Sequence, residues 1–331
     1  MPDTTTQTRI EYFDALRAWA AVAVVLIHAA APDWGSLEPT DPQWQAVNVY
    51  DGMARWAVPI FFMVSGALFL SPEREITTDY VFRKALLRLA YAFVPWSIFY
   101  ALLTRTADGW GEVARRIVIG HDHMWFLWAL AGLYAATPLL RAIAADRTLA
   151  RYFVYLGLVV TSALPVLAAI PGTALVGEPI VSAMQLSVGY ALFFMLGHLL
   201  ATTRRPMRLA WLWTVLGIVA TIVGTSVWSV LSGAPVHVLY DYLMPPVVLA
   251  SVGVFAAARR RRGTSALVRL LADHSLGIYL SHMAFLLLYE AIGPKTAPVL
   301  QVPLETVFAL AGSLALAMVV KRIPGVGQYL A

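Results

Sequence analysis

Cysteine is absent from the 331 residues of this chain, and only 13% of the residues are charged. Without cysteine, the sequence offers no disulfide framework, no thiolate metal site and no cysteine nucleophile. Soluble domains carry about a quarter charged residues, so a chain that is 60% apolar has too little charge to form a soluble surface. The sequence also lacks a G-x-S-x-G elbow, a Walker loop and an H-E-x-x-H pair, so these soluble-enzyme mechanisms gain no support.

The apolar residues occur in blocks of about 20, the length of helix that crosses roughly 30 Å of hydrocarbon. This pattern predicts an all-α polytopic membrane protein with about ten transmembrane helices. The N-terminal stretch is polar and acidic, without a basic region or a cleavage site, so the first block is expected to be a retained span. We expect residues 1–331 to form a single integral-membrane domain with no appended soluble domain. The predicted spans are 12–31, 52–71, 86–104, 122–141, 152–170, 182–202, 209–231, 240–258, 274–293 and 303–321.

The positive charges predict the orientation. The net charge is +5, but Lys and Arg cluster between apolar blocks and not in a stripe among aromatics, which argues against nucleic-acid binding. With the N-terminus in the cytoplasm, eighteen Lys and Arg fall inside and four outside, so both termini are expected to be cytoplasmic. The discordant outside loop is 105–121, and the stretch from Asp108 to His121 within it is predicted to be amphipathic and to lie along the interface. The other outside loops are predicted at 32–50, 171–181, 232–239 and 294–302.

The first predicted span carries three ionisable residues, Asp14, Arg17 and His28. Such residues are costly inside a membrane and indicate a functional site by default. His28 comes eleven positions, about three helical turns, after Arg17, so the two share one face with His28 roughly 16 Å deeper. Asp14 lies one turn before Arg17 and can pair with it. The alternative is that Asp14 and Arg17 mark the interface and that His28 caps the far end of the span.

A second histidine, His282, lies in the segment 274–293, which runs in the same direction as the first span. We therefore expect His28 and His282 at similar depth, where they could converge. An imidazole that titrates near pH 7 suits general-base work on a hydroxyl. A packed, hydrogen-bonded histidine is an equally good interpretation of His282 taken alone.

The segment that begins at His121 contains His121, Asp122 and His123, which could suggest a metal cluster. Adjacent helical positions point in different directions and no further ligand follows at i+4, so no metal site is expected. Trp125 and Trp128 of the same segment fit an aromatic belt.

In the second predicted span, Asp51 and Arg55 are spaced i, i+4, as for a salt bridge. Ser65 and Gly66 in the same span most simply allow close helix packing.

Four separated stretches resemble the membrane-bound acyltransferase-3 family, which O-acylates cell-surface sugars and related acceptors. They cover the chain in order: RIEYFDALRAWAAVAVVLIHAA, FFMVSGALFL, HMWFLWALAGLYAATPLL and HSLGIYLSH. The first contains Arg17 and His28, separated by ten residues as in the family. One position departs from the family pattern: in FRKALLRLAYAFVP, Arg88 matches the second arginine of an Arg-x-x-Arg pair, but Ala85 stands at the first.

The resemblance implies an acyl-CoA donor from the cytoplasm, acetyl-CoA by default and succinyl-CoA as an option. Arg88, Arg83 and Lys84 are the candidate donor contacts, since guanidinium groups suit phosphate. His28 would act as general base on the acceptor hydroxyl or as a brief acyl-histidine. Arg17, oriented by Asp14, would hold the donor or polarise its carbonyl.

The implied acceptor is an extracytoplasmic or lipid-linked glycan, or a small antibiotic or lipid, and the implied location is a bacterial inner membrane. The candidate acceptor-binding residues are His123, Trp125, His282 and Ser65. No metal is expected. The alternative from another class is a transporter or flippase for a glycolipid or acylated intermediate, because transporters also use intramembrane Arg and His.

Overall fold

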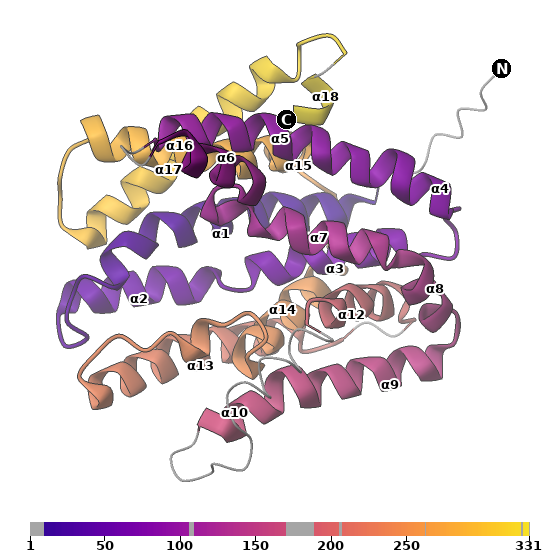
Figure 1. The fold of residues 1–331 in the computed structure, drawn as a ribbon. Helices are drawn as coiled ribbons and strands as arrows, with labels where there is room; N and C mark the ends of the chain where they lie inside the picture. The colour runs from indigo at the N-terminus through magenta and orange to yellow at the C-terminus, as the bar shows by residue number, and fades with distance from the viewer. Residues whose placement is uncertain are drawn as a thin grey trace.

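The computed structural model describes residues 10–105, 109–169, 189–204, 207–261, 263–325 and 327–330, and within these ranges the chain is helical without a strand. The long helices lie roughly side by side in one bundle (Figure 1). The first half contains α1 (Glu11–Trp34), α2 (Pro42–Ala54), α3 (Ala57–Phe69), α4 (Thr78–Tyr80), η1 (Val81–Ala85), α5 (Leu86–Leu103), α6 (Trp110–Ile119), η2 (Asp122–Met124), α7 (Trp125–Ala135) and α8 (Thr137–Ala145). The second half contains α9 (Arg147–Leu158), η3 (Val159–Ala163), α10 (Leu164–Ala169), α12 (Ala191–Thr202), α13 (Ala210–Ser232), η4 (Val238–Tyr240), α14 (Pro245–Ala258), α15 (Ala266–Asp273), α16 (Ser275–Ile292), α17 (Pro298–Val320) and α18 (Gly327–Leu330).

Eight helical segments among the described residues are long and apolar enough to cross a membrane. A ninth is added if the pair Trp110–Ala135 and Thr137–Ala145, bent by 59°, counts as one span. The predicted span 182–202 corresponds in its described part to α12, a shorter apolar helix of 12 residues, while 182–188 lies outside the described residues. The prediction of an all-α polytopic membrane protein is confirmed.

The first helix, α1, packs against α2, α3, α14, α15, α16 and α17 and so lies inside the bundle. Its buried positions are rich in alanine, between Ala15 and Ala30. Lipid tails are as apolar as leucine, so helices associate in membranes mainly by close packing, and small residues let their backbones approach. The alanines of α1 therefore allow several helices to surround it.

The helices α3 and α12 cross at two glycines. A β-carbon on Gly66 would lie 1.8 Å from the carbonyl oxygen of Phe194, and one on Gly197 would lie 1.9 Å from that of Met63. No side chain fits between these backbones. The predicted close helix packing at Ser65 and Gly66 is confirmed at Gly66.

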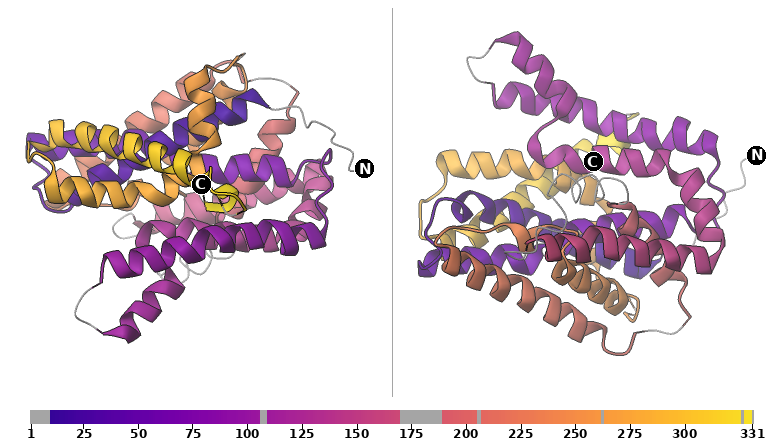
Figure 2. Two further views of the ribbon diagram at one scale, coloured as in Figure 1. Left: turned by 90° about the horizontal axis from the view of Figure 1, so that it is seen from above. Right: turned by 60° about the horizontal axis from the view of Figure 1, so that its bottom comes forward.

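The surface of the bundle carries large apolar side chains, for example Leu102 on α5 and Val223 on α13, which are 50% and 53% exposed. The α5–α6 pair stands at one edge of the bundle (Figure 2). Exposure of apolar side chains to water is unfavourable in free energy, whereas their contact with lipid tails is not, because the tails are equally apolar. This surface is that of an integral membrane protein.

The predicted loop at 32–50 is wrong in its second part, where α2 begins at Pro42. The carboxylate of Asp41 accepts a hydrogen bond of 2.7 Å from the amide of Gln43. An Asp cap followed by proline at the first helical position is a strong start signal. Trp44 is fully buried, so this helix packs into the bundle and does not lie in an open loop.

The predicted amphipathic stretch between 108 and 121 forms the helix α6, although Asp108 lies outside the described residues. It packs against α5. The Ser97 hydroxyl of α5 lies 3.2 Å and 2.5 Å from the carbonyl oxygens of Arg116 and Ile117. Its placement along the membrane interface stays a prediction.

Candidate active site

His28 lies in the second half of α1, and its Nδ1 is 2.9 Å from the carbonyl oxygen of Val24, one turn earlier. A carbonyl oxygen can only accept a hydrogen bond, so Nδ1 carries the hydrogen and the lone pair of the neutral ring is on Nε2. The helix backbone thus fixes the tautomer in which Nε2 can accept a proton.

His282 of α16 faces His28, with 4.9 Å between the ring centroids. The expected similar depth of the two histidines is confirmed, and they converge. The Nδ1 of His282 donates to the carbonyl oxygen of Tyr279 at 2.7 Å, so its lone pair is also on Nε2. His282 is fully buried, and its Nε2 has no hydrogen-bond partner within the described part of the chain.

His123 completes a triangle of rings. Its centroid lies 5.2 Å from that of His282 and 6.2 Å from that of His28. The ring is buried, and its Nε2 has no hydrogen-bond partner in the ranges that the structure describes. We call His28, His121, His123 and His282 the histidine cluster. Two buried imidazoles, from η2 and α16, thus lie against the partly buried imidazole of α1.

His121 and His123 turn toward each other, with 2.9 Å between their Nδ1 atoms, so one donates and the other accepts. The expectation that neighbouring positions point apart is wrong here, because these residues are not α-helical. Gly120 has φ +86°, His121 is extended and η2 is a 3₁₀ turn. Such a break within a span is tolerated where the backbone is buried in protein or lines a cavity. Among the described residues, no group of three or more His, Asp or Glu side chains is arranged to hold a metal ion.

Two tyrosines hold the cluster in place. The Tyr279 hydroxyl donates to the carbonyl oxygen of His123 at 2.5 Å, and that of Tyr100 donates to the carbonyl oxygen of Leu280 at 2.7 Å. The Tyr100 ring lies 5.0 Å from His123. These bonds tie α5, η2 and α16 together, so the imidazoles are held in position before any ligand binds.

Asp51 and Arg55 form the predicted salt bridge, and both side chains are largely buried. The Arg55 guanidinium lies 4.3 Å from the centroid of Tyr240. The charges of both residues act on the His28 ring. Arg55 Nε and Asp51 Oδ1 have no hydrogen-bond partner in the described ranges. The i, i+4 spacing predicted this ion pair but gave no sign that its charges act on His28.

His237, in the loop before η4, packs on Trp34 with 3.8 Å between ring centroids. Burial, and then the charge of Arg55, lower the pKa of His237, so its ring is neutral at pH 7. Arg55 is therefore the cation on this side of His28.

Arg17 and Asp14 form the predicted ion pair, at 2.6 Å, with Asp14 buried and 37% of the Arg17 side chain exposed. The pair lies about three helical turns, roughly 16 Å, from His28 along α1. The structure therefore does not bring Arg17 into the histidine cluster.

The candidate donor contacts lie on η1 and α5, and all three are exposed. Arg83 pairs with Asp79 at 2.7 Å, although both side chains are exposed, and Lys84 lies 5.9 Å from the ring of Tyr80. Arg88 is close enough to the Tyr134 ring for its charge to act there. Ala85, at the position where the family pattern has arginine, is buried.

The remaining two candidates lie outside the cluster. Trp125 stacks on Tyr242, with 5.9 Å between the ring centroids. The Tyr242 ring in turn lies 5.9 Å from the Arg55 guanidinium, so Tyr242 links Trp125 to Arg55. Ser65 forms a side-chain hydrogen bond with the Tyr134 hydroxyl, on which the charge of Arg88 also acts.

The arrangement defines a class of protein: a helical membrane bundle with histidines from three of its segments gathered inside it. A family model described as an acyltransferase domain, that of the acyltransferase-3 family, matches residues 10–322. Searches among curated proteins and among solved structures return no match. The chain belongs to the acyltransferase-3 family and is an integral-membrane acyltransferase.

Proposed function

We propose that this acyltransferase moves an acetyl group from cytoplasmic acetyl-CoA to a hydroxyl of a glycan or glycolipid on the other side of a bacterial inner membrane. The observation that carries the proposal is the convergence of His28, His123 and His282, with backbone carbonyls fixing the tautomers of His28 and His282. The Nε2 lone pair of His28 lies next to the rings of His123 and His282, whose Nε2 atoms have no hydrogen-bond partner among the described residues. This setting suits proton removal from a hydroxyl.

In the proposed reaction, Nε2 of His28 takes the proton of the acceptor hydroxyl while its oxygen attacks the thioester carbon. The C–S bond then breaks, the new C–O bond remains, and the CoA thiolate receives the proton from the His28 imidazolium. The negative charge on the carbonyl oxygen needs a cation or donor nearby. Arg55 meets that need better than Arg17, because its charge acts on His28 while Arg17 lies about three turns away.

In an alternative route, the same Nε2 lone pair attacks the thioester carbon, the C–S bond breaks with CoA leaving as the thiolate, and an acyl-histidine forms. Water or the acceptor hydroxyl would then take the acyl group in a second step. Rapid quenching with labelled acetyl-CoA, followed by peptide mapping, separates the routes: label on the peptide that contains His28 supports the two-step route.

We assign the donor to the N-terminal end of α1. Arg17, oriented by Asp14, holds the donor, and Arg83, Lys84 and Arg88 contact its phosphates. The excess of Lys and Arg on the predicted cytoplasmic side supports this placement, since CoA is a polyanion. With the donor's polar end near Arg17, its long arm would extend along α1 toward His28.

The test is acetyl-CoA turnover by the purified protein in nanodiscs. Because the chain contains no cysteine, a thiol reagent reports only the CoA released. We expect release that rises with added surface glycan, together with labelled acetate on that glycan. A transporter, which the family match does not favour, would leave acetyl-CoA intact.

A further inference from the structure

A polar cavity of about 340 Å³ lies between α5 and α6, beside the histidine cluster. This volume is at the lower end of the range for small-molecule sites, roughly 300–1,000 Å³. The sequence pattern assigns no role to this cavity. Its two arginines, Arg115 and Arg116, lie in the predicted outside loop that departs from the cytoplasmic bias of Lys and Arg. The lining residues that matter for a ligand are Tyr100, Arg115, Arg116, Ile119, His121 and Asp122.

The cavity meets the proposed catalytic centre at two residues. His121 lines the cavity, and its Nδ1 is 2.9 Å from that of His123. Tyr100 also lines it, with ring centroids 4.8 Å from His121 and 5.0 Å from His123. A ligand in the cavity is thus separated from the buried imidazoles by one layer of side chains.

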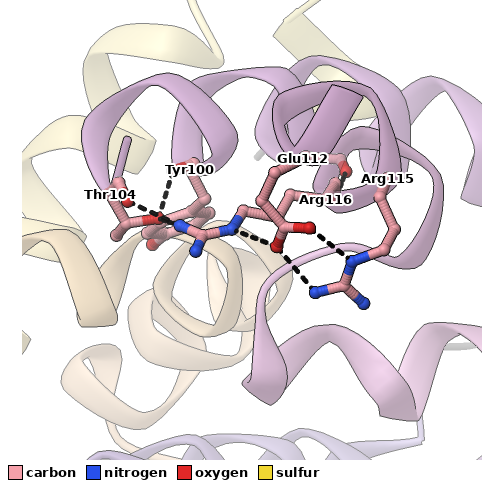
Figure 3. Close-up of polar contacts among 6 residues, drawn as sticks. Tyr100, Thr104, Glu112, Arg115 and Arg116 are labelled. Carbon is pink, nitrogen blue, oxygen red and sulfur yellow. Dashed lines mark hydrogen bonds and ion pairs between the residues drawn. The ribbon is translucent and has the colours of Figure 1, made fainter. Parts of the chain in front are cut away.

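A network of ion pairs fixes the cavity wall (Figure 3). Glu112 accepts two hydrogen bonds of 2.7 Å from Arg115 and one of 2.9 Å from Arg116. Arg116 Nη1 also donates to the carbonyl oxygen of Thr104 at 2.6 Å, which joins α6 to the end of α5. Within the described residues, Nη1 of Arg115 and Nη2 of Arg116 take no part in these bonds. The wall therefore keeps donors for a ligand.

The fixed charges around the cavity balance. Arg115 and Arg116 are matched by Glu112 and by Asp122, and His121 adds no charge when it is neutral. An anionic ligand would need a surplus of positive charge. A neutral sugar needs donors and acceptors side by side, because each hydroxyl both donates and accepts. The guanidinium nitrogens and the Asp122 carboxylate offer that combination.

We propose that this cavity binds one neutral sugar residue of the acceptor and brings it to the histidine cluster. The inference deepens the proposed function and rests on it. It assigns the acceptor to the cavity between α5 and α6, and it selects against sugar acids, whose carboxylate would meet Asp122 in a cavity without surplus positive charge.

The absence of cysteine allows a direct test. Ile119→Cys places a thiol on the cavity lining, while Val118→Cys places one on the next residue of α6, which is exposed but does not line the cavity. Labelling of each variant by a small polar maleimide in nanodiscs is measured with methyl hexosides (gluco, galacto and manno) and with the matching methyl uronides.

We expect at least one methyl hexoside to slow labelling of Ile119→Cys several-fold and to leave Val118→Cys unchanged. The matching uronide should protect several-fold less. Adding Arg115→Gln to the Ile119→Cys variant should remove the protection, whereas adding Arg105→Gln, another arginine of the α5–α6 hairpin, should keep it. Octyl glycosides of the protecting sugar distinguish a glycolipid source from a free glycan, and protection by either supports the cavity.

Equal or stronger protection by the uronides would overturn the proposal, and so would protection of both thiols or of neither. These outcomes are separate from failure of the proposed function. If acetyl-CoA turnover depends on His28 but no sugar protects Ile119→Cys, the acyltransferase mechanism stands and the cavity assignment fails. If sugars protect but acetyl-CoA stays intact, the proposed reaction fails.

Discussion

The histidine cluster and the basic surface of η1 and α5 are built in opposite ways. His123 and His282 are buried, and their neighbours hold them by hydrogen bonds. Arg83 and Lys84 are exposed, and Arg83 forms an ion pair with Asp79, itself exposed. The cluster is set in the resting protein, whereas the basic side chains are free to adapt to a ligand.

The two regions differ in rigidity because the tasks proposed for them, proton transfer and donor binding, make different demands. Proton transfer depends on distances held within fractions of an ångström, so its groups need a rigid shell. Attraction of a polyanion works over longer distances and tolerates mobile side chains. Substitutions should therefore reduce kcat at the first region and raise KM at the second.

The largest expected effect is that of His28→Ala. Removal of the proposed base should lower acyl transfer by about 10²- to 10⁴-fold. His274→Ala is the matched control, because His274 also bonds through Nδ1 to a carbonyl one turn earlier, at 2.8 Å, but lies outside the cluster. Labelled acetyl transfer is measured at equal abundance in the membrane. Full activity in His28→Ala would refute its assignment as base.

Arg55→Gln should have the next largest effect. Loss of a donor to a developing oxyanion costs about 10²- to 10³-fold in rate. Breaking a buried ion pair also destabilises a protein by about 3–5 kcal/mol, because the partner charge stays buried. The double variant Arg55→Gln, Asp51→Asn restores charge balance, so it should recover thermal stability and not kcat. Recovery of kcat would show that the pair serves only the fold.

Two substitutions of His282 resolve the role of its two nitrogens. Asparagine can keep the donor that bonds to the Tyr279 carbonyl, while glutamine places an amide near Nε2. If Nε2 faces the reacting groups, His282→Gln should keep more activity than His282→Asn, with a difference of roughly tenfold in kcat. The reverse order would indicate that His282 serves only to hold the helix turn.

The smallest effects belong to the basic surface. Arg88→Gln should raise the KM for acetyl-CoA about two- to fivefold, because an exposed ion pair contributes only about 0.2–1 kcal/mol. Arg83→Gln should do less, since Asp79 already shares its charge. Ala85→Arg, which restores the family pattern, should lower KM if the buried position tolerates the side chain. Steady-state kinetics at low and high salt measure the three, and a change in kcat alone would contradict a donor-binding role.

The sequence predicted correctly those features of the site that depend on spacing within a single helix. The spacing from Arg17 to His28 gives depth along a single axis, and the i, i+3 and i, i+4 spacings gave the pairs Asp14–Arg17 and Asp51–Arg55. The alignment of His28 with His282 also followed, because their segments run in the same direction.

The remainder of the site depends on how helices rotate against one another, which periodicity within one helix does not determine. His123 reaches the cluster only because the chain breaks at Gly120 and makes a 3₁₀ turn. The charge of Arg55, at the end of α2, acts on His28 because α2 packs on α1. Asp41 followed by Pro42 is a sequence signal for the start of α2, although the pattern of apolar blocks predicted a loop at this position.

Within the part of the chain that the structure describes, the Nε2 atoms of His123 and His282 have no hydrogen-bond partner, and this has a thermodynamic consequence. A buried polar atom without a partner costs about 1–3 kcal/mol, so the resting bundle carries a penalty at its centre. A hydroxyl that enters and bonds there removes part of that penalty, and the binding free energy then adds to the stability of the fold. The protein should therefore unfold at a higher temperature when its true acceptor is bound. Measuring the melting temperature of the protein with each glycan of a panel would then identify the acceptor without any acyl transfer.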